Sequence, residues 1–562
     1  MAIRPRIVRT LASLDGADES DGSTVLTPLR QPEPGDDVAT EPPGAASNDP
    51  NVEPDFDEAT YLRAFPDIAD AVRRGLLVSG LAHFRQSGEA ERRLEKPEYR
   101  ALLRADAAPA PPAVAIDTLT ISPSGATLIT GWSDDRFDAL VEVDLPTHPG
   151  TRHNWVGFPR LARADVDRTL DAATGHRFGF LLVAAPVGER TTIDAGAANA
   201  PGFRFASGGE TRLRRQPVVA SDADLRDQAL AALPMLAPGT QDPAALYAIL
   251  DQHVGVQIVA INRLIVEQAR ARRMVERFGP SRGRYRGSII TSLRGGADQI
   301  VPRLTLLATG PGAEDHEFSI VVTDPDQFEP ALRAARLATV SLDLPLTLVL
   351  QPGGDPAGSG EDAAADVARS DRLILMDQSV LPREPDWLAR HSALLDGMPA
   401  RQTKLFGSLL ARPDGTLSHA GYYFDRETTF LPRRQDVPER IVSVRLKTIS
   451  HPVARGVPEG RAVLGVPATF MSIDRGWFAA LGGFTRNYCR GVYEDIDFCL
   501  RSLSRGVPPW IYPLPLWHFD RRPPLRAEPS KGGEILNNWL LHRQWDEIIV
   551  PDLLGLSPTL PA

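Results

Sequence analysis

Cysteine is scarce in this chain of 562 residues, which contains only Cys489 and Cys499. Two cysteines cannot form a disulfide framework, and neither has the CxxC or Cys/His spacing that would hold a structural zinc ion. The scarcity therefore indicates a reducing compartment, and we expect a cytoplasmic protein.

Long apolar runs are also missing. The N-terminus, MAIRPRIVRTLASLDGADES, is basic but lacks the apolar core of roughly 7 to 15 residues that a secretory signal needs. No later segment approaches the ~20 apolar residues that span a bilayer. We therefore expect no membrane-spanning helix, and we leave open a peripheral association with the inner face of a membrane.

Net positive charge is lacking as well, because 72 acidic residues outnumber 62 lysines and arginines and give a formal net charge of -10. Nucleic acids are bound through basic patches that contact phosphates, so this balance argues against a general nucleic-acid binder. The chain also has no GxGxxG or GxxxxGK[ST] motif after an expected strand. Readings as an NAD enzyme or a simple ATPase thereby lose their main support.

Proline is plentiful, and 50 prolines in a chain long enough for three or four domains of roughly 150 residues predict separate units joined by linkers. Residues 15–55 are rich in Asp, Glu, Gly, Pro and Ser, and we expect the N-terminal segment 1–55 to be disordered. An Ala/Pro linker is expected at 105–114 and a tail at 549–562.

Three units are expected ahead of the main domain. The stretch FDEATYLRAFPDIADAVRRGLLVSGLAHFRQSGEAERR has apolar residues at helical spacing, which predicts a small helical module over 56–104 with its aromatic residues in the core. Alternating apolar and polar residues between Gly and Pro turns predict a β-sandwich-like accessory domain over 115–215. Apolar runs with few breakers predict a helical connector over 220–280.

The main domain is expected over residues 284–548. Here the short apolar runs GSIITSL, EFSIVVTD, LTLVLQ and RLILMD are separated by stretches of helical periodicity, which predicts an α/β fold with a parallel sheet covered by helices. Such sheets bind ligands beyond the carboxyl ends of their strands. This rule points to Thr323, Asp324, Asp326, Asp377 and Ser379, although aspartates after strands also form simple turns.

The segment GVYEDIDFCLR gathers three acids before an apolar run with helical spacing, in which Ile496, Cys499, Leu500 and Leu503 form one stripe. Helix chemistry accounts for two of the acids: Glu494 suits a helix N-terminus, and Asp497 can pair with Arg501 one turn on. Asp495 lies beside the buried stripe. Its carboxylate is therefore expected to face an enclosed pocket, where a general base is useful.

The stretch ATFMSIDRGWFAALGGFTRNYCRGVYEDIDFCLRSLSRGVPPWIYPLPLWHFD resembles the signature of glycosyltransferase family 2, in which GGF and ED.DLC.R are followed by a strand carrying His. The resemblance covers about residues 287–548 and implies the Rossmann-like GT-A fold, which binds nucleotide sugars. The helical segment and the stretch from GWSDD to HRFGF resemble accessory N-terminal domains of bacterial polysaccharide-related glycosyltransferases.

The resemblance implies roles for several residues. Asp495 corresponds to the base that deprotonates the acceptor hydroxyl, with Glu494 supporting it. Asp324 and its neighbour Asp326 fall where the family binds the nucleotide. Asp377 and Ser379 fall on the D-x-D motif that holds Mn²⁺ or Mg²⁺ on the sugar diphosphate.

The match at D-x-D is incomplete, because this chain reads Asp377, Gln378, Ser379 and keeps a single carboxylate. The implied metal is therefore in doubt, with Asp377 and His518 as its candidate ligands. If a metal is absent, other positive charges must stabilise the diphosphate. Arg521 and Arg522, which follow His518 closely, are the candidates, and a solvated loop is the plainer explanation for them.

Acceptor-binding positions are expected at Trp510, within a C-terminal concentration of tryptophans, and at Gly483 of the GGF motif. We expect a cytoplasmic glycosyltransferase that uses a nucleotide-sugar donor and a surface-polysaccharide, lipid-linked or protein acceptor. The resemblance implies that the reaction inverts the anomeric centre. The alternative is a catalytically inactive GT-A-like protein that binds glycan or acts as a scaffold in polysaccharide assembly, and the altered DQS motif favours it.

Overall fold

We describe the protein from a computed structural model. It describes residues 56–96, 114–148, 152–154, 159–170, 177–186, 200–236, 243–353, 356–426, 442–446, 460–490, 493–519 and 528–549, apart from isolated positions, together with Tyr99 and Leu553. The predicted disordered segment 1–55, the linker at 105–113 and nearly all of the tail at 549–562 lie outside these residues.

The first described unit consists of helices α2 (Glu58–Ala64), α3 (Pro66–Arg73) and α4 (Gly80–His83), a π-helical turn (Phe84–Gly88) and a 3-10 turn (Arg93–Glu95). Its core is aromatic, with Tyr61 and Tyr99 fully buried beside Phe65 and Phe84. Glu58 joins α2 to α4 by accepting hydrogen bonds from the amides of Gly80 and Leu81. The expected packing role of the aromatic residues is confirmed.

Two facing sheets form the next unit. One has the order β5 (Arg160–Leu161), β6 (Gly179–Ala184), β2 (Thr127–Ser133), β1 (Val114–Ile121), β9 (Val218–Val219). The other has the order β4 (Arg152–Asn154), β3 (Leu140–Asp144), β7 (Gly202–Phe205), β8 (Glu210–Arg212). Alternate residues of both sheets share one core, where the rings of Phe180 and Phe203 lie 6.0 Å apart. This is the packing of a β-sandwich.

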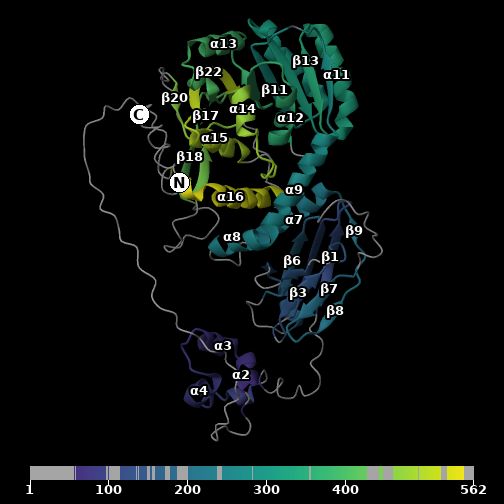
Figure 1. The fold of residues 1–562 in the computed structure, drawn as a ribbon, viewed down its shortest axis with the longest axis vertical. Coiled ribbons are helices and arrows are strands. Elements are labelled where there is room, and N and C mark those ends of the chain that lie inside the picture. The colour runs from purple at the N-terminus through teal and green to yellow at the C-terminus, as the bar shows by residue number, and fades with distance from the viewer. Residues whose placement is uncertain are drawn as a thin grey trace, which may run out of the picture.

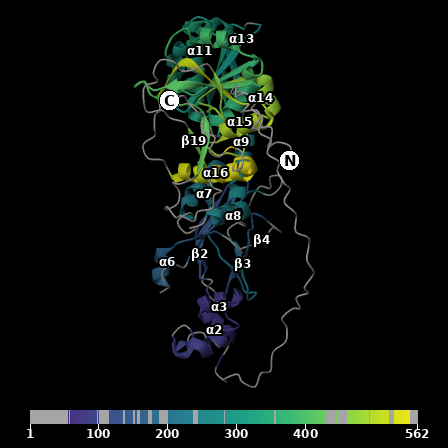
Figure 2. The same cartoon turned by 90° about the vertical axis from the view of Figure 1, so that its left-hand side faces the viewer.

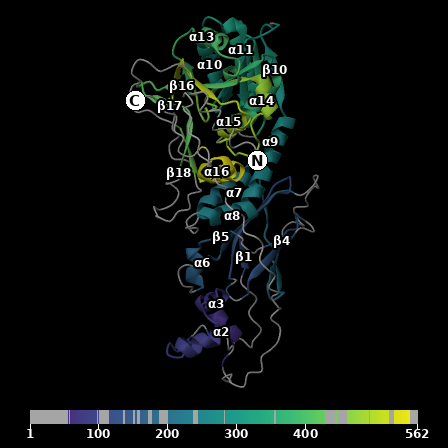
Figure 3. The same ribbon diagram turned by 60° about the vertical axis from the view of Figure 1, so that its left-hand side comes forward.

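Helices α7 (Asp222–Leu236), α8 (Pro243–Gln252) and α9 (Val254–Ala271) follow, and the C-terminal helix α16 (Glu528–Ile548) packs against α7. Figures 1 and 2 show α16 lying between α7 and α15 (Glu494–Ser504). Figure 3 shows the two-sheet unit on the other side of α7 and α8 from the large sheet. The close packing needs Gly532, where a Cβ would overlap the carbonyl oxygen of Leu230.

The helical connector is shorter than the expected 220–280. Residues Met274–Phe278 form strand β10, which pairs antiparallel with β13 (Leu346–Leu350) and so belongs to the large sheet. Helical periodicity in the preceding run hid this edge strand. Within the described residues no single helix is long and apolar enough to span a bilayer. Only the bent pair Leu246–Gln252 and Val254–Ala271 meets that criterion, by length and composition alone.

The large sheet has a Rossmann-like half. Strands β13, β12 (His316–Val322), β11 (Gly287–Leu293) and β14 (Arg372–Met376) run parallel in that order. Beyond β14 the sheet continues through β21 (Phe470–Asp474), β16 (Leu405–Ala411), β22 (Trp510–His518) and β15 (Val380–Pro382), with β21 antiparallel to both neighbours. The α/β class with a parallel sheet covered by helices, which the sequence predicts for this domain, is confirmed.

Successive strand residues point to opposite faces of this sheet. Both faces carry apolar side chains, so helices cover both. Ile289 faces a core shared with α10 (Ile300–Ala308), α11 (Phe328–Leu342) and α13 (Trp387–Gly397). Ile290 faces a core shared with α12 (Glu361–Val367), α14 (Arg475–Leu481), α15 and α16. Smaller strands complete the domain: β17 (Leu417–His419), β18 (Tyr422–Arg426), β19 (Val442–Leu446) and β20 (Arg461–Ala462).

Candidate functional site

One edge of the large sheet collects polar residues. Arg294 follows β11, Asp324 follows β12 by two residues and Asp377 follows β14, so all three lie at the carboxyl ends of the parallel strands. Antiparallel β21 enters the sheet at this same edge, since the amide of Asp377 donates to the carbonyl of Thr469 at 3.0 Å. An open α/β sheet binds its ligand at this end of its strands, which we call the ligand edge.

Asp495 reaches this edge from the first turn of α15. Its Oδ2 accepts a hydrogen bond from the amide of Ala468 at 3.0 Å and another from the hydroxyl of Tyr422 at 2.8 Å, and its Oδ1 accepts from the amide of Ile496 at 2.8 Å. The side chain is buried, with 8% of its surface exposed. Three donors, from β18, from the loop before β21 and from α15 itself, thus fix the orientation of this carboxylate.

Glu494 is bonded very differently, although it precedes Asp495 directly. It is 4% exposed, and its Oε2 has no hydrogen-bond partner among the residues that the structure describes. The π-helical turn Pro356–Gly360 covers it, because a Cβ on Gly358 would lie 3.4 Å from Glu494 Cγ. The amide of Gly358 donates to Oε2 of Glu361 at 3.2 Å, so two buried glutamates flank one turn.

These buried carboxyls differ in which one holds a proton. Burial raises the pKa of Asp495, and its hydrogen bonds from Tyr422 and Ala468 oppose that rise. Burial and then the charge of Asp495 raise the pKa of Glu494 well above its ordinary value, and burial raises the pKa of Glu361 to about 8. Hydrogen bonds to an ionised carboxylate favour that form. We therefore assign the negative charge to Asp495 and a neutral acid to Glu494.

Asp497 has the structural role expected for it. Its Oδ2 accepts from Arg501 Nε at 2.8 Å, and its Oδ1 accepts from Trp545 Nε1 at 2.8 Å. Asp497 is fully buried, and the expected stripe of apolar residues on α15 is buried with it. Asp497 therefore ties α15 to the C-terminal helix α16.

The DQS turn is closed on itself. Oδ1 of Asp377 accepts hydrogen bonds from the amide of Ser379 at 2.8 Å and from its hydroxyl at 2.6 Å. Oδ2 of Asp377 lies 3.6 Å from Nη2 of Arg294. Both carboxylate oxygens of Asp377 therefore already have partners within the protein.

His518 is brought close to this turn. Strands β15 and β22 pair antiparallel with Val380 opposite His518, and the amide of Phe519 donates to the carbonyl of Ser379 at 2.8 Å. The two candidate metal ligands, Asp377 and His518, thus lie in the same corner of the sheet edge.

These residues do not fit a divalent metal well. Hard cations prefer several carboxylate oxygens, and the described residues contain no cluster of three His, Cys, Asp or Glu side chains that could hold an ion. Ser379 occupies Oδ1 of Asp377, and a cation on Oδ2 would meet the guanidinium of Arg294 as a like charge. The chemistry of this donor set therefore disagrees with a D-x-D metal site.

Asp324 and Asp326 lie farther along the edge and are exposed. Oδ1 of Asp324 accepts from the amide of Asp326 at 3.0 Å and caps a short 3-10 turn, Pro325–Gln327. Their position beyond β12 leaves them open to solvent and to a ligand.

Trp510 and Gly483 are not brought to this constellation. Trp510 begins β22 at the opposite edge of the sheet from His518, is 5% exposed, and packs against Phe406 and Tyr512. The expected acceptor platform is therefore not formed by Trp510, because its ring fills a core. Gly483 has a φ of +69°, and a Cβ there would lie 2.8 Å from Oδ1 of Asp362, which indicates close backbone packing. Arg521 and Arg522 lie outside the described residues.

Several residues at the site were not expected from the sequence: Arg294, Arg303, Glu361 and Tyr422. Arg294 directly follows a strand, so the strand-end rule that selected Asp377 could also have selected it. Glu361 and Tyr422 belong to no motif, and only the folded chain brings them to α15.

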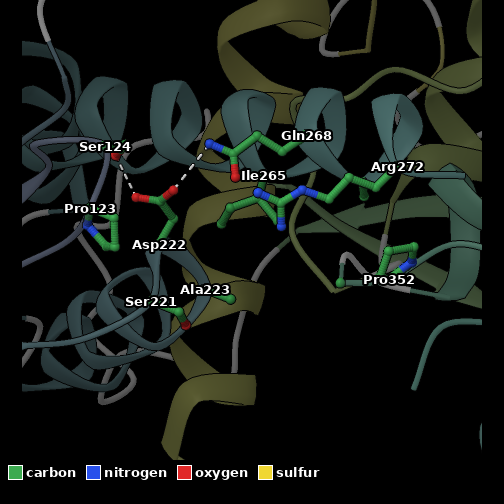
Figure 4. A pocket seen from close by; sticks show the side chains of 11 residues that line it. Pro123, Ser124, Ser221, Asp222, Ala223, Ile265, Gln268, Arg272 and Pro352 are labelled. Carbon is green, nitrogen blue, oxygen red and sulfur yellow. Dashed lines mark hydrogen bonds between the residues drawn. The ribbon is translucent and has the colours of Figure 1, made fainter. Parts of the chain in front are cut away.

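A separate cavity of ≈ 400 Å³ lies between the β1–β2 turn, the start of α7, the end of α9 and the loop after β13. Figure 4 shows Ser124 and Gln268 pointing toward Asp222, whose carboxylate accepts from the hydroxyl of Ser124 at 2.5 Å and from Nε2 of Gln268 at 3.3 Å. Asp222 is thus satisfied within the protein, and the cavity's lining includes none of the catalytic candidates.

Comparisons with known proteins give only distant likenesses. No protein-family model matches the chain. No curated protein matches it either.

Three solved structures are similar over part of the chain. GalNAc-T7, solved with UDP, GalNAc and Mn²⁺, is 13% identical with a TM-score of 0.34 over 48% of this chain and 49% of its own, so the match spans about half its length. Mannosyltransferase PcManGT from Pyrobaculum calidifontis, solved with GDP-Man and Mn²⁺, is 14% identical with a TM-score of 0.28 over 58% and 84%. A mycobacterial protein is 16% identical with a TM-score of 0.28 over 50% and 77%. At such TM-scores the function has to be argued from the residues of the site.

Proposed function

We propose that this protein is a glycosyltransferase that moves a sugar from a nucleotide-sugar donor to a hydroxyl group of an acceptor. The observation that carries the proposal is Asp495, a buried carboxylate held by three hydrogen bonds at the ligand edge of a Rossmann-like sheet. A carboxylate fixed in this way suits a general base, because its orientation is set before substrate binds and its hydrogen bonds favour the ionised form.

The proposed step is a direct displacement that inverts the anomeric centre. The acceptor oxygen forms a bond to the anomeric carbon while the bond from that carbon to the donor's phosphate oxygen breaks. The nucleoside diphosphate leaves with the electron pair, and Asp495 takes the proton of the acceptor hydroxyl. Glu494, as a neutral acid with a free oxygen, is suited to orient the acceptor by hydrogen bonding.

The proposed reaction leads to assignments for the donor site, the acceptor and the location. Asp324 and Asp326 are proposed to contact the nucleotide from the open end of β12, and Asp377 and Ser379 to shape the site of the diphosphate. A surface polysaccharide, a lipid-linked glycan or a protein is the proposed acceptor. We place the reaction in the cytoplasm, at or near the inner face of a membrane.

A donor screen tests the proposal. The full chain is incubated with a panel of nucleotide sugars, with and without Mn²⁺, and both binding and release of nucleoside diphosphate are measured. Saturable binding to one donor class with slow release of its diphosphate is the expected result. A folded protein that binds no donor under either condition would overturn the proposal.

The rival function is a non-catalytic glycan-binding or scaffold protein. Its specific support is Asp377, whose carboxylate is bonded within the protein rather than free for a metal-bound diphosphate. Saturable glycan binding without any donor turnover would favour this function.

A further inference from the structure

The loop after β11 contacts the DQS turn after β14, and the arginine of that loop makes the contact. The backbone amide of Arg294 donates to Oε1 of Gln378 at 3.1 Å, and Nη2 of Arg294 lies 3.6 Å from Oδ2 of Asp377. The Arg294 side chain therefore faces the turn.

A second guanidinium lies beneath the same turn. Arg303 on α10 is 5% exposed, and it donates to the carbonyls of Asp377 at 2.9 Å, Gln378 at 3.2 Å and Val380. Its charge is compensated mainly by the single carboxylate of Asp377, which opposes the lowering of its pKa by burial. Two guanidiniums thus flank one acid.

Arg294 also acts on the two buried glutamates that flank the π-helical turn. Its positive charge counteracts the effect of burial on the pKa of both Glu361 and Glu494. About half of its side chain, 52%, is exposed, so a ligand can reach it. Arg294 therefore lies between the proposed base region on α15 and the turn at which the family motif predicts a metal-bound diphosphate.

We propose that Arg294, supported from below by Arg303, binds the diphosphate of the donor and stabilises the departing nucleoside diphosphate in place of a D-x-D metal. The proposal rests on the proposed function. It identifies Asp377 as the resting counter-ion of Arg294, which the diphosphate replaces on binding.

The chemistry of guanidinium suits this role. Its planar array of donors matches phosphate oxygens in a bidentate way. When the anomeric bond breaks, the electron pair moves to the phosphate oxygen, and a fixed cation stabilises that developing charge. Net positive charge at the turn, from two arginines and one aspartate, makes an anion favourable there.

Binding of UDP and GDP to the full-length protein tests the inference. Dissociation constants are measured by calorimetry with a chelator and with Mn²⁺ for wild type, Arg294→Gln, Arg294→Lys and Asp377→Asn. Arg284→Gln is the matched control. Arg284 precedes β11 at the opposite edge and is 87% exposed in an ion pair with Asp371.

The inference predicts that wild type binds a diphosphate equally well, within about threefold, with chelator or Mn²⁺. Arg294→Gln should weaken binding more than tenfold, Arg294→Lys less, and Arg284→Gln not at all. Asp377→Asn should keep or tighten the affinity, because it frees Arg294. A metal ligand at Asp377 would instead make that variant lose binding.

Binding that needs Mn²⁺, or an Arg294→Gln variant with unchanged affinity, would overturn the inference. Either result leaves the proposed function standing if donor turnover persists with Mn²⁺. Failure of the folded wild type to bind any donor or diphosphate under both conditions would overturn the proposed function and the inference together.

Discussion

The hydroxyl of Tyr422 donates a hydrogen bond to Oδ2 of Asp495 at 2.8 Å, so strand β18 directly supports a carboxylate at the start of α15. This bond opposes the rise that burial causes in the pKa of Asp495. Tyr422→Phe should therefore raise that pKa. Because a base must be ionised to work, we predict that the acidic limb of the pH–rate profile moves to higher pH, with a smaller loss at alkaline pH. An unmoved limb would contradict the support role of Tyr422.

Asp497→Asn should act on stability and not on the proposed chemistry. The buried ion pair between Asp497 and the partly exposed Arg501 would lose its charge, while Asn can still accept from Trp545. Breaking a buried pair costs about 3 kcal/mol in unfolding free energy. Denaturant unfolding checks this value, and donor turnover per folded molecule should stay near that of wild type.

The stability of the protein should depend on pH through Glu361. Burial raises the pKa of Glu361 from 4.5 to about 8, so the folded state favours its protonated form. The stabilisation is complete below about pH 4.5 and is lost as the pH rises through 8, at about 1.4 kcal/mol for each unit of pKa displacement.

Glu361→Gln cannot ionise, so its unfolding free energy should fall less than that of wild type between pH 5 and 8. Urea unfolding at a series of pH values measures this difference. Asp362, whose pKa burial raises to about 7, contributes the same trend to both proteins and cancels in the comparison. Parallel curves for wild type and variant would contradict the assignment of a buried proton to Glu361.

Gly483→Ala tests the close packing after α14. Its φ of +69° strains any side chain, and a Cβ would lie 2.8 Å from Oδ1 of Asp362, which already accepts from the amide of Phe484. We predict a loss of about 2–4 kcal/mol in unfolding free energy. Gly482→Ala is the matched control: φ is +84° but no atom lies near, so about 1 kcal/mol is expected.

Local patterns predicted the parts of the site that lie within one segment. The helical spacing of Ile496, Cys499, Leu500 and Leu503 predicted the buried stripe of α15, and the pairing of Asp497 with Arg501 followed from a separation of one turn. Strand ends predicted the edge at which Asp377 lies, because parallel strands share their carboxyl ends.

Relationships between distant segments could not be predicted in this way. His518, at the end of β22, reaches the ligand edge and Trp510, at its start, does not, because β22 runs parallel to β16; strand direction and order are set by tertiary pairing rather than by composition. Glu361 meets the first turn of α15 only through the π-helical turn Pro356–Gly360. The pairing of Asp377 with Arg294 likewise depends on the contact between two loops, which no motif records.

The central claim is that Asp495 is the base of a glycosyl transfer, and turnover of a nucleotide sugar by Asp495→Asn tests it most directly. Release of nucleoside diphosphate from the best donor is compared with that of wild type at equal, separately measured donor binding. The account predicts that Asp495→Asn lowers turnover by roughly 10²-fold or more while folding and donor affinity stay nearly unchanged. Wild-type turnover in that variant would contradict it.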